Sequence, residues 1–255
     1  MPAHPYIGIT GFTDRQQVIE AFFRVPDYAR RRLMVGVLAS YKSLRSLPMR
    51  EQWAKQTPPS DKLGSIFFEH PQVLNLIHYS AGAAEDHDFD RDLIDLSHHA
   101  GLAHHGFQLN MAWPSPTALH RVHGQDWLGG LTIVLQIGPR AIALAGGTLE
   151  GVVDKLKQYT GLAQYVLLDG SGGLGRALNV EWARQYLRAF RDARLPFSLG
   201  VAGGLGPNSM EPVQELIAEF PDLSWDAQGR LRNRDHALNT ILACEYLDLS
   251  YALVR

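Results

Sequence analysis

Short apolar runs alternate along the whole chain with longer segments whose apolar residues recur at helical spacing. Several runs are apolar at almost every position, which is typical of parallel strands covered on both faces. In segment 179–193, for example, Val180 and Leu187 fall on one stripe of a helix. Asn179 and Ser209 have the side-chain chemistry of helix N-caps. The predicted strands are residues 6–10, 33–39, 73–79, 106–112, 131–137, 165–169, 197–201 and 223–226.

Eight strands, each followed by a helical segment, have two economical arrangements: a doubly wound open sheet and a closed barrel. The count of eight within 255 residues favours a single (β/α)8 barrel, or TIM barrel, over residues 1–255. A doubly wound sheet would carry a glycine-rich fingerprint after its first strand, and the turn at 10–14 (TGFTD) has no such spacing. Residues 44–62 predict an irregular helix and a loop because they contain charges and prolines, and residues 114–126 predict a short helix.

Charge and composition narrow the classes of partner. Lys and Arg number 24 against 26 Asp and Glu, so the formal net charge is -2 and the basic face that nucleic acid needs is not expected. The single cysteine, Cys244, cannot form an internal disulfide or a cysteine-cluster zinc site. The N-terminus lacks a signal-peptide pattern, and the most apolar stretch, residues 128–137, is too short to span a bilayer. These features predict a cytoplasmic protein without a nucleic-acid or membrane partner.

Three glycine-rich loops follow the last three predicted strands. They read LLDGSGGLG at 167–175, VAGGLGPN at 201–208 and WDAQGR at 225–230. Ligands of such barrels bind where the strands end, and phosphate sites are frequently built from the loops after strands seven and eight. Glycine amides can approach an anion closely, although each loop taken alone also fits a tight turn. The phosphate site predicted by the three loops together consists of Gly172, Gly173, Gly203, Gly204 and Gly229.

These motifs resemble phosphoribosylanthranilate isomerase, a family built on the ribulose-phosphate-binding type of barrel. The family carries Leu-Leu-Asp and a glycine-rich loop at its sixth strand, matched at 167–175, and Ala-Gly-Gly-Leu at its seventh, matched at 202–205. Its first strand reads Cys-Gly-Ile-Thr where this chain has IGIT at 7–10, and its Gln-Leu-His-Gly strand is echoed in part by QLNM at 108–111. The resemblance covers both ends of the chain well and the middle weakly.

The resemblance implies an Amadori-type rearrangement of a small phosphorylated aminoaldose to an aminoketose. The family's general acid corresponds to Asp169, and its general base, a cysteine, corresponds to Ile7. Because isoleucine cannot take a proton, and losing a positioned base costs roughly 10²–10⁴ in rate, efficient phosphoribosylanthranilate isomerisation is not expected. The arginine that holds the aromatic acid is replaced by Lys42, which cannot form the same bidentate fork. Thr10 and Gln108 lie in the matched motifs and are expected beside Lys42 in the substrate site.

Two strand-end residues could stand in for the missing base, His78 and Asp226. A histidine there is also commonly just hydrogen-bonded within the barrel, and a strand-end aspartate can cap the next turn. Three functions remain open: an isomerase-like enzyme, a non-catalytic phosphate-ligand sensor on the same barrel, and a lyase that forms an imine with Lys42.

Two further segments contain residue types that bind metals, but their spacing is not that of a known metal site. The histidines of 98–105 (HHAGLAHH) have no carboxylate at that spacing, and the acidic run at 85–90 (EDHDFD) lacks the central glycine and distal glutamate of a calcium loop. We therefore expect no cofactor and no metal. The expected ligand is a small phosphorylated metabolite, and a homodimer is one assembly that the sequence leaves open.

Overall fold

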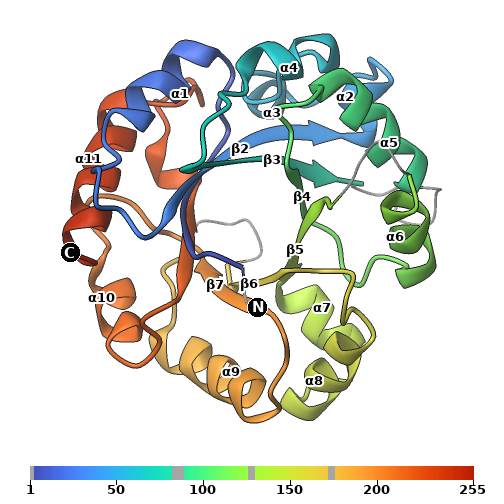
Figure 1. Ribbon diagram of the computed structural model, residues 1–255, viewed down its shortest axis with the longest axis vertical. Helices are drawn as coiled ribbons and strands as arrows, with labels where there is room; N and C mark the ends of the chain where they lie inside the picture. The colour runs from blue at the N-terminus through green and yellow to red at the C-terminus, as the bar shows by residue number, and fades with distance from the viewer. Residues whose placement is uncertain (1–2, 82–88, 126–129, 172–175) are drawn as a thin grey trace.

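Eight parallel strands close into a barrel in the computed structural model, which describes residues 3–81, 89–125, 130–171 and 176–255. Each strand pairs with the next along the chain, and β8 pairs with β1. The helices surround the strands (Figure 1), so the predicted (β/α)8 barrel is confirmed. The strands are β1 Tyr6–Thr10, β2 Arg32–Ser40, β3 Val73–Ser80, β4 Gly106–Leu109, β5 Thr132–Ile137, β6 Tyr165–Asp169, β7 Ser198–Ala202 and β8 Ser224–Ala227.

The outer helices begin largely where the sequence predicts them. Asn179 caps α9 as predicted, because its side chain accepts from the N–H of Trp182. The N-cap predicted at Ser209 is wrong: α10 begins at Glu211, and Ser209 Oγ donates instead to the Gly204 carbonyl. The helices are α1 Arg15–Phe22, α2 Tyr41–Leu44, α3 Glu51–Ala54, α4 Leu63–Ile66, α5 Phe89–Ala100, α6 Pro116–His123, α7 Pro139–Leu144, α8 Leu149–Lys157, α9 Val180–Asp192, α10 Glu211–Ile217 and α11 Thr240–Ala252.

Strand side chains alternate between two buried layers. One layer lies inside the barrel and includes Met34, Leu76 and Leu167, and the other packs beneath the helices. The interior is tight beside β1, where a Cβ on Gly8 would lie 2.6 Å from the Met34 methyl carbon. Apolar side chains therefore fill the barrel interior toward the amino ends of the strands, and space for a ligand begins at their carboxyl ends.

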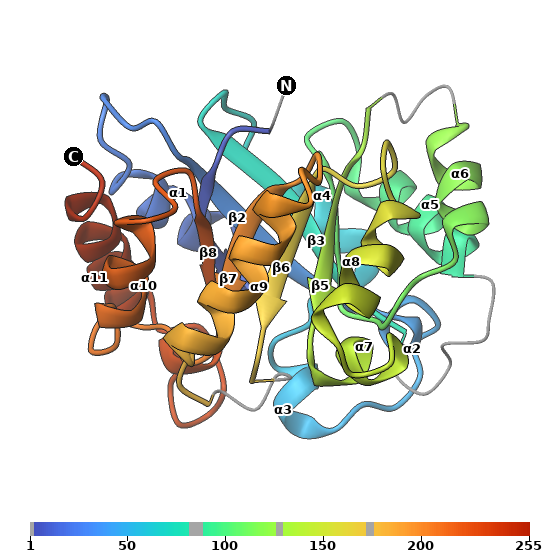
Figure 2. The same cartoon turned by 90° about the horizontal axis from the view of Figure 1, so that it is seen from below.

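The connection between β2 and β3 is the irregular stretch expected within residues 44–62. It holds α2, α3, a 3₁₀ turn at Ser60–Lys62 and α4 rather than one long helix. Ser40 and Ser43 cap the start of α2 reciprocally, since the side chain of each accepts from the backbone N–H of the other. Figure 2 shows α3 at the end of the barrel toward which the strand arrows point. This connection thus covers part of the barrel mouth.

Candidate functional site

A cavity of about 1000 Å³ opens at the carboxyl ends of the strands. Seven of the eight strands, all but β1, contribute lining residues, and the rim is formed by the connection after β2 and the loop after β8. Thr10 of β1 lies behind this lining, in contact with Asp226. Gly172 and Gly173 lie outside the described residues. The predicted site residues that line the cavity are Lys42, His78, Gln108, Asp169, Gly203, Gly204, Asp226 and Gly229.

Asp226, in β8, is a buried carboxyl group at the floor of the cavity and is only 5% exposed. One of its oxygens accepts from Thr10 Oγ1 at 3.0 Å and from Gln108 Nε2 at 3.3 Å. Burial raises the pKa of Asp226 to about 7, the two donors oppose this rise, and the negative charge of Asp169 adds to it. A carboxyl group with this pKa can both accept and release a proton near neutral pH.

Asp169, at the end of β6, is the second buried carboxyl group of the floor. It accepts hydrogen bonds from Gln136 Nε2 at 2.8 Å, from the Ser171 N–H at 3.0 Å and from Ser171 Oγ at 2.6 Å. These contacts fix the direction of the carboxyl group toward the cavity. Gln136 was not predicted as a site residue, and the available signal was an amide side chain near the end of the apolar run at 131–137.

His78, on β3, also faces the cavity and is 6% exposed. Neither of its ring nitrogens has a hydrogen-bond partner among the described residues. Burial lowers the pKa of His78 to about 4, so the imidazole is neutral at pH 7 and is a weak base. Of the two predicted stand-in bases, Asp226 therefore has the pKa better suited to proton transfer.

Positive side chains surround the mouth of the cavity. Arg232 reaches furthest inward and donates to the carbonyl oxygens of Thr10 and Gly11. Burial lowers its pKa to about 10, and the charge of Asp226 acts in the opposite direction. Position 11 must be glycine for this arrangement, since its φ is +105° and a Cβ would lie 1.7 Å from Arg232 Nη2. The exposed members of this basic rim are Lys42, Arg50 and Arg234.

Gly203 and Gly204 turn the chain at the end of β7. A Cβ on Gly204 would lie 2.6 Å from the carbonyl oxygen of Arg176, and its φ is +58°, so the backbone packing itself requires glycine there. Within the described ranges, the N–H groups of Gly203, Gly204 and Gly229 donate to no protein acceptor. These three amides are therefore available to an oxyanion.

Ile7, the residue that corresponds to the family's cysteine, does not face the cavity. It is fully buried and packs in the outer layer beneath the helices. The inward positions of β1 at this level are Gly8 and Thr10, because strand side chains alternate. A proton acceptor on β1 would therefore have to occupy an inward position instead.

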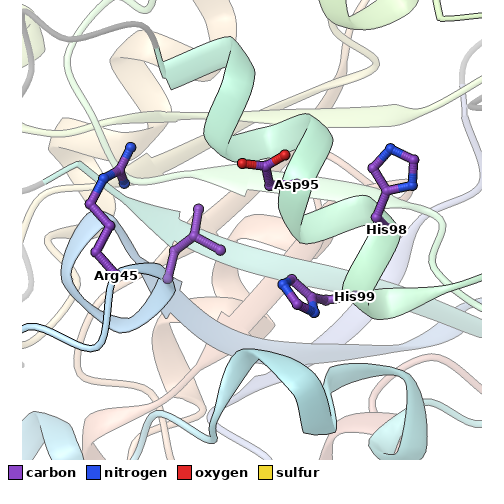
Figure 3. A pocket seen from close by; sticks show the side chains of 5 residues that line it. Arg45, Asp95, His98 and His99 are labelled. Carbon is purple, nitrogen blue, oxygen red and sulfur yellow. The ribbon is translucent and has the colours of Figure 1, made fainter.

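A smaller pocket of about 330 Å³ lies on the outer surface between α2 and α5. Arg45, Asp95, His98 and His99 surround it (Figure 3). In the part of the chain that the structure describes, no group of three His, Cys, Asp or Glu side chains is arranged to hold a metal ion. Four residues of the acidic run, 85–88, lie outside that part.

A helix needs about 20 consecutive, mostly apolar residues to span a bilayer. Among those the structure describes, none is long and apolar enough to cross a membrane.

Comparisons with known proteins show the fold. No protein-family model matches the chain, and no curated protein matches it in sequence. The phosphoribosyl anthranilate isomerase of Thermus thermophilus superposes with a TM-score of 0.64 and 15% identity, covering 97% of this chain and 99% of that one. A phosphoribosyl anthranilate isomerase in complex with reduced 1-(o-carboxyphenylamino)-1-deoxyribulose 5-phosphate gives 0.60 and 14%, with coverages of 97% and 99%. The putative copper homeostasis protein CutC of Streptococcus agalactiae gives 0.50 and 12%, with coverages of 88% and 99%. At these identities the chain shares a (β/α)8 barrel with these proteins.

Proposed function

We propose that the protein binds a small phosphorylated metabolite in the strand-end cavity and catalyses proton transfer on its carbon skeleton, as in an aldose–ketose isomerisation. One observation carries the proposal: two buried carboxyl groups, Asp169 and Asp226, share the floor of one cavity, and the pKa of Asp226 is about 7. Isomerisation of this kind needs a group that takes a proton from carbon and a group that serves the substrate oxygen.

The two carboxyl groups take different roles in this proposal. Asp226 removes the proton from one carbon and returns it to the neighbouring carbon, because a base with a pKa near 7 is half ionised at neutral pH and strong enough to accept it. Asp169 enters the step protonated, gives its proton to the carbonyl oxygen and takes a proton from the neighbouring hydroxyl group, from the direction fixed by Gln136 and Ser171. His78 contributes as a neutral hydrogen-bonding group.

The phosphate group is proposed to lie at the side of the cavity where β7 and β8 end. Gly203, Gly204 and Gly229 present N–H groups there that donate to no acceptor within the described residues. The basic rim supplies positive potential around the same mouth. We include Gly172 and Gly173 in this site from the sequence motif alone.

Solvent-proton exchange tests this function without knowledge of the product. Aldose and ketose 5-phosphates would be incubated with the protein in D₂O, and deuterium at the carbons beside the carbonyl would be followed by NMR. The expected result is exchange that Asp226→Asn and Asp169→Asn each slow by about 10²–10⁴. The matched control is Asp192→Asn, since Asp192 is an exposed carboxylate at the end of α9.

Exchange no faster than in protein-free solution, over the whole panel, would contradict catalysis. Ligand binding without exchange would then support the sensor. The imine-forming lyase is tested by borohydride trapping with the same carbonyl compounds, and we expect no adduct because Lys42 is exposed rather than desolvated. We also expect no growth rescue of a strain that lacks phosphoribosylanthranilate isomerase, since Ile7 carries no proton acceptor and the inward positions of β1, Gly8 and Thr10, carry no thiol.

A further inference from the structure

Four buried polar atoms at the floor of the cavity have no hydrogen-bond partner within the described ranges. They are both ring nitrogens of His78, Oε1 of Gln108 and Oε1 of Gln136. All three residues line the same cavity and come from three consecutive strands, β3, β4 and β5. His78 and Gln108 are direct neighbours in the register of β3 and β4. Buried polar groups in folded proteins are almost always hydrogen-bonded to protein, to a ligand or to water, so these four atoms can bond a ligand that displaces water from the cavity.

The orientation of the two glutamine amides follows from the carboxyl groups beside them. Gln108 Nε2 donates to Asp226, and Gln136 Nε2 donates to Asp169. In its ionised form a carboxyl group only accepts hydrogen bonds, so next to an ionised Asp226 and Asp169 each amide presents its nitrogen to the carboxylate. Among the described residues no protein group donates to either amide oxygen, and an amide oxygen can only accept.

The floor and the mouth of the cavity therefore have opposite chemistry. The floor combines two amide oxygens with two carboxyl groups, and a neutral imidazole adds one donor and one acceptor. The mouth carries Arg232 and the exposed cations of the basic rim. An anionic group is repelled from the floor and attracted to the mouth, whereas hydroxyl groups can donate to every acceptor of the floor.

We propose that His78, Gln108 and Gln136 form a subsite that recognises neighbouring hydroxyl groups of the ligand and so orients it with its polyol end at the floor and its phosphate at the mouth. This inference rests on the proposed function for the position of the phosphate. It assigns Gln136 as a specificity-determining residue, and it gives His78 a role in binding rather than in proton removal.

Two probes of equal chain length distinguish the contribution of the hydroxyl groups to binding from that of the phosphate. Ribitol 5-phosphate carries a hydroxyl group on each of the other carbons, whereas n-pentyl phosphate carries the phosphate alone. We expect calorimetric titration of the wild-type protein to show about 100-fold tighter binding of ribitol 5-phosphate, because a site built to bond hydroxyl groups rejects an analogue that lacks them. Ribitol without phosphate is the third probe and reports the floor alone.

Two variants test whether these residues cause the preference for ribitol 5-phosphate. Gln136→Met and Gln108→Met keep the side-chain length and remove the amide, and each should reduce the preference for ribitol 5-phosphate over pentyl phosphate by about tenfold. Pentyl phosphate itself should bind these variants as it binds the wild type. Gln214→Met, an exposed position on α10, is the matched control and should leave both affinities unchanged.

The outcomes distinguish this inference from the proposed function. Equal affinity of the wild type for ribitol 5-phosphate and pentyl phosphate would overturn the hydroxyl subsite and leave phosphate binding intact. Binding of ribitol but of neither phosphate ester would support the subsite and refute the phosphate site. Binding of none of the three probes would overturn both. The wild-type comparison needs no substitution, so it holds even if a variant fails to fold.

Discussion

Replacing Asp226 with asparagine should stabilise the folded protein at alkaline pH while it removes the proposed base. Burial raises the pKa of Asp226 from 3.8 to about 7, so ionisation is less favourable in the folded protein than in the unfolded chain. Between these two pH values the folded state binds more protons, and the free energy of unfolding therefore falls as the pH rises. The loss is complete above pH 7 and amounts to roughly 4 kcal/mol.

The variant Asp226→Asn removes this loss because the amide carries no charge. Its oxygen can occupy the position where Thr10 and Gln108 now donate to one carboxylate oxygen. We expect the variant to match the wild type within about 1 kcal/mol near pH 4 and to be about 2–4 kcal/mol more stable at pH 8. Urea unfolding at a series of pH values measures the difference.

The difference in unfolding free energy between the wild type and Asp226→Asn reports on Asp226, because the other titrating groups are present in both proteins. His78 and His104, whose pKa values burial lowers to about 4, make both proteins less stable as the pH falls below 6.5. Asp192→Asn, which removes an exposed carboxylate, is the matched control variant. If the stability difference for Asp226→Asn were the same at pH 5 and pH 8, or if the variant were less stable at pH 8, the reasoning would be refuted.

Three further predictions concern the scaffold. Arg45→Met leaves the fully buried Asp92 carboxylate without its two guanidinium hydrogen bonds and should cost about 3–5 kcal/mol in urea unfolding, and a loss below about 1 kcal/mol would contradict this. His104→Gln should make stability less sensitive to acid, because the buried imidazole has a pKa of about 4 and contributes stability that is lost as the pH falls from 6.5. Unfolding at pH 7 and pH 4.5 tests this, and an unchanged difference between the two pH values counts against it. Gly106→Ala would bring a Cβ within 1.9 Å of a carbonyl oxygen on β5 and should cost more than about 3 kcal/mol, whereas Gly101→Ala, with nothing within 4 Å, should cost about 1 kcal/mol in thermal unfolding.

Closure of the barrel could be predicted from the sequence because it follows from a local pattern. Apolar runs with helices between them indicate strands covered on both faces, and eight such units in 255 residues are the size of a closed barrel. The sequence also predicts at which end of the barrel a ligand site would lie, since the carboxyl ends of parallel strands all meet at one end. For this reason residues as distant as Lys42 and Gly229 were expected together, and both line the cavity.

The direction and environment of each side chain depended on the tertiary structure. The motif at 7–10 matches a family whose cysteine is catalytic, yet the barrel turns Ile7 outward and leaves Gly8 and Thr10 inside. Gln136 was not predicted to be functional. Its hydrogen bond to Asp169 exists only because the neighbouring strand β6 places Asp169 beside it, and the sequence around Gln136 does not show this contact.

The sequence by itself thus determined the type of fold and the end of the barrel at which the candidate site lies, because both depend on the order of apolar and glycine-rich segments. Only the tertiary structure decided which groups can exchange a proton. Barrel closure places Thr10 against Asp226, which is 216 positions further along the chain. The pKa of about 7 arises from the exclusion of water around that carboxyl group, a property of the assembled barrel that no local stretch of sequence contains.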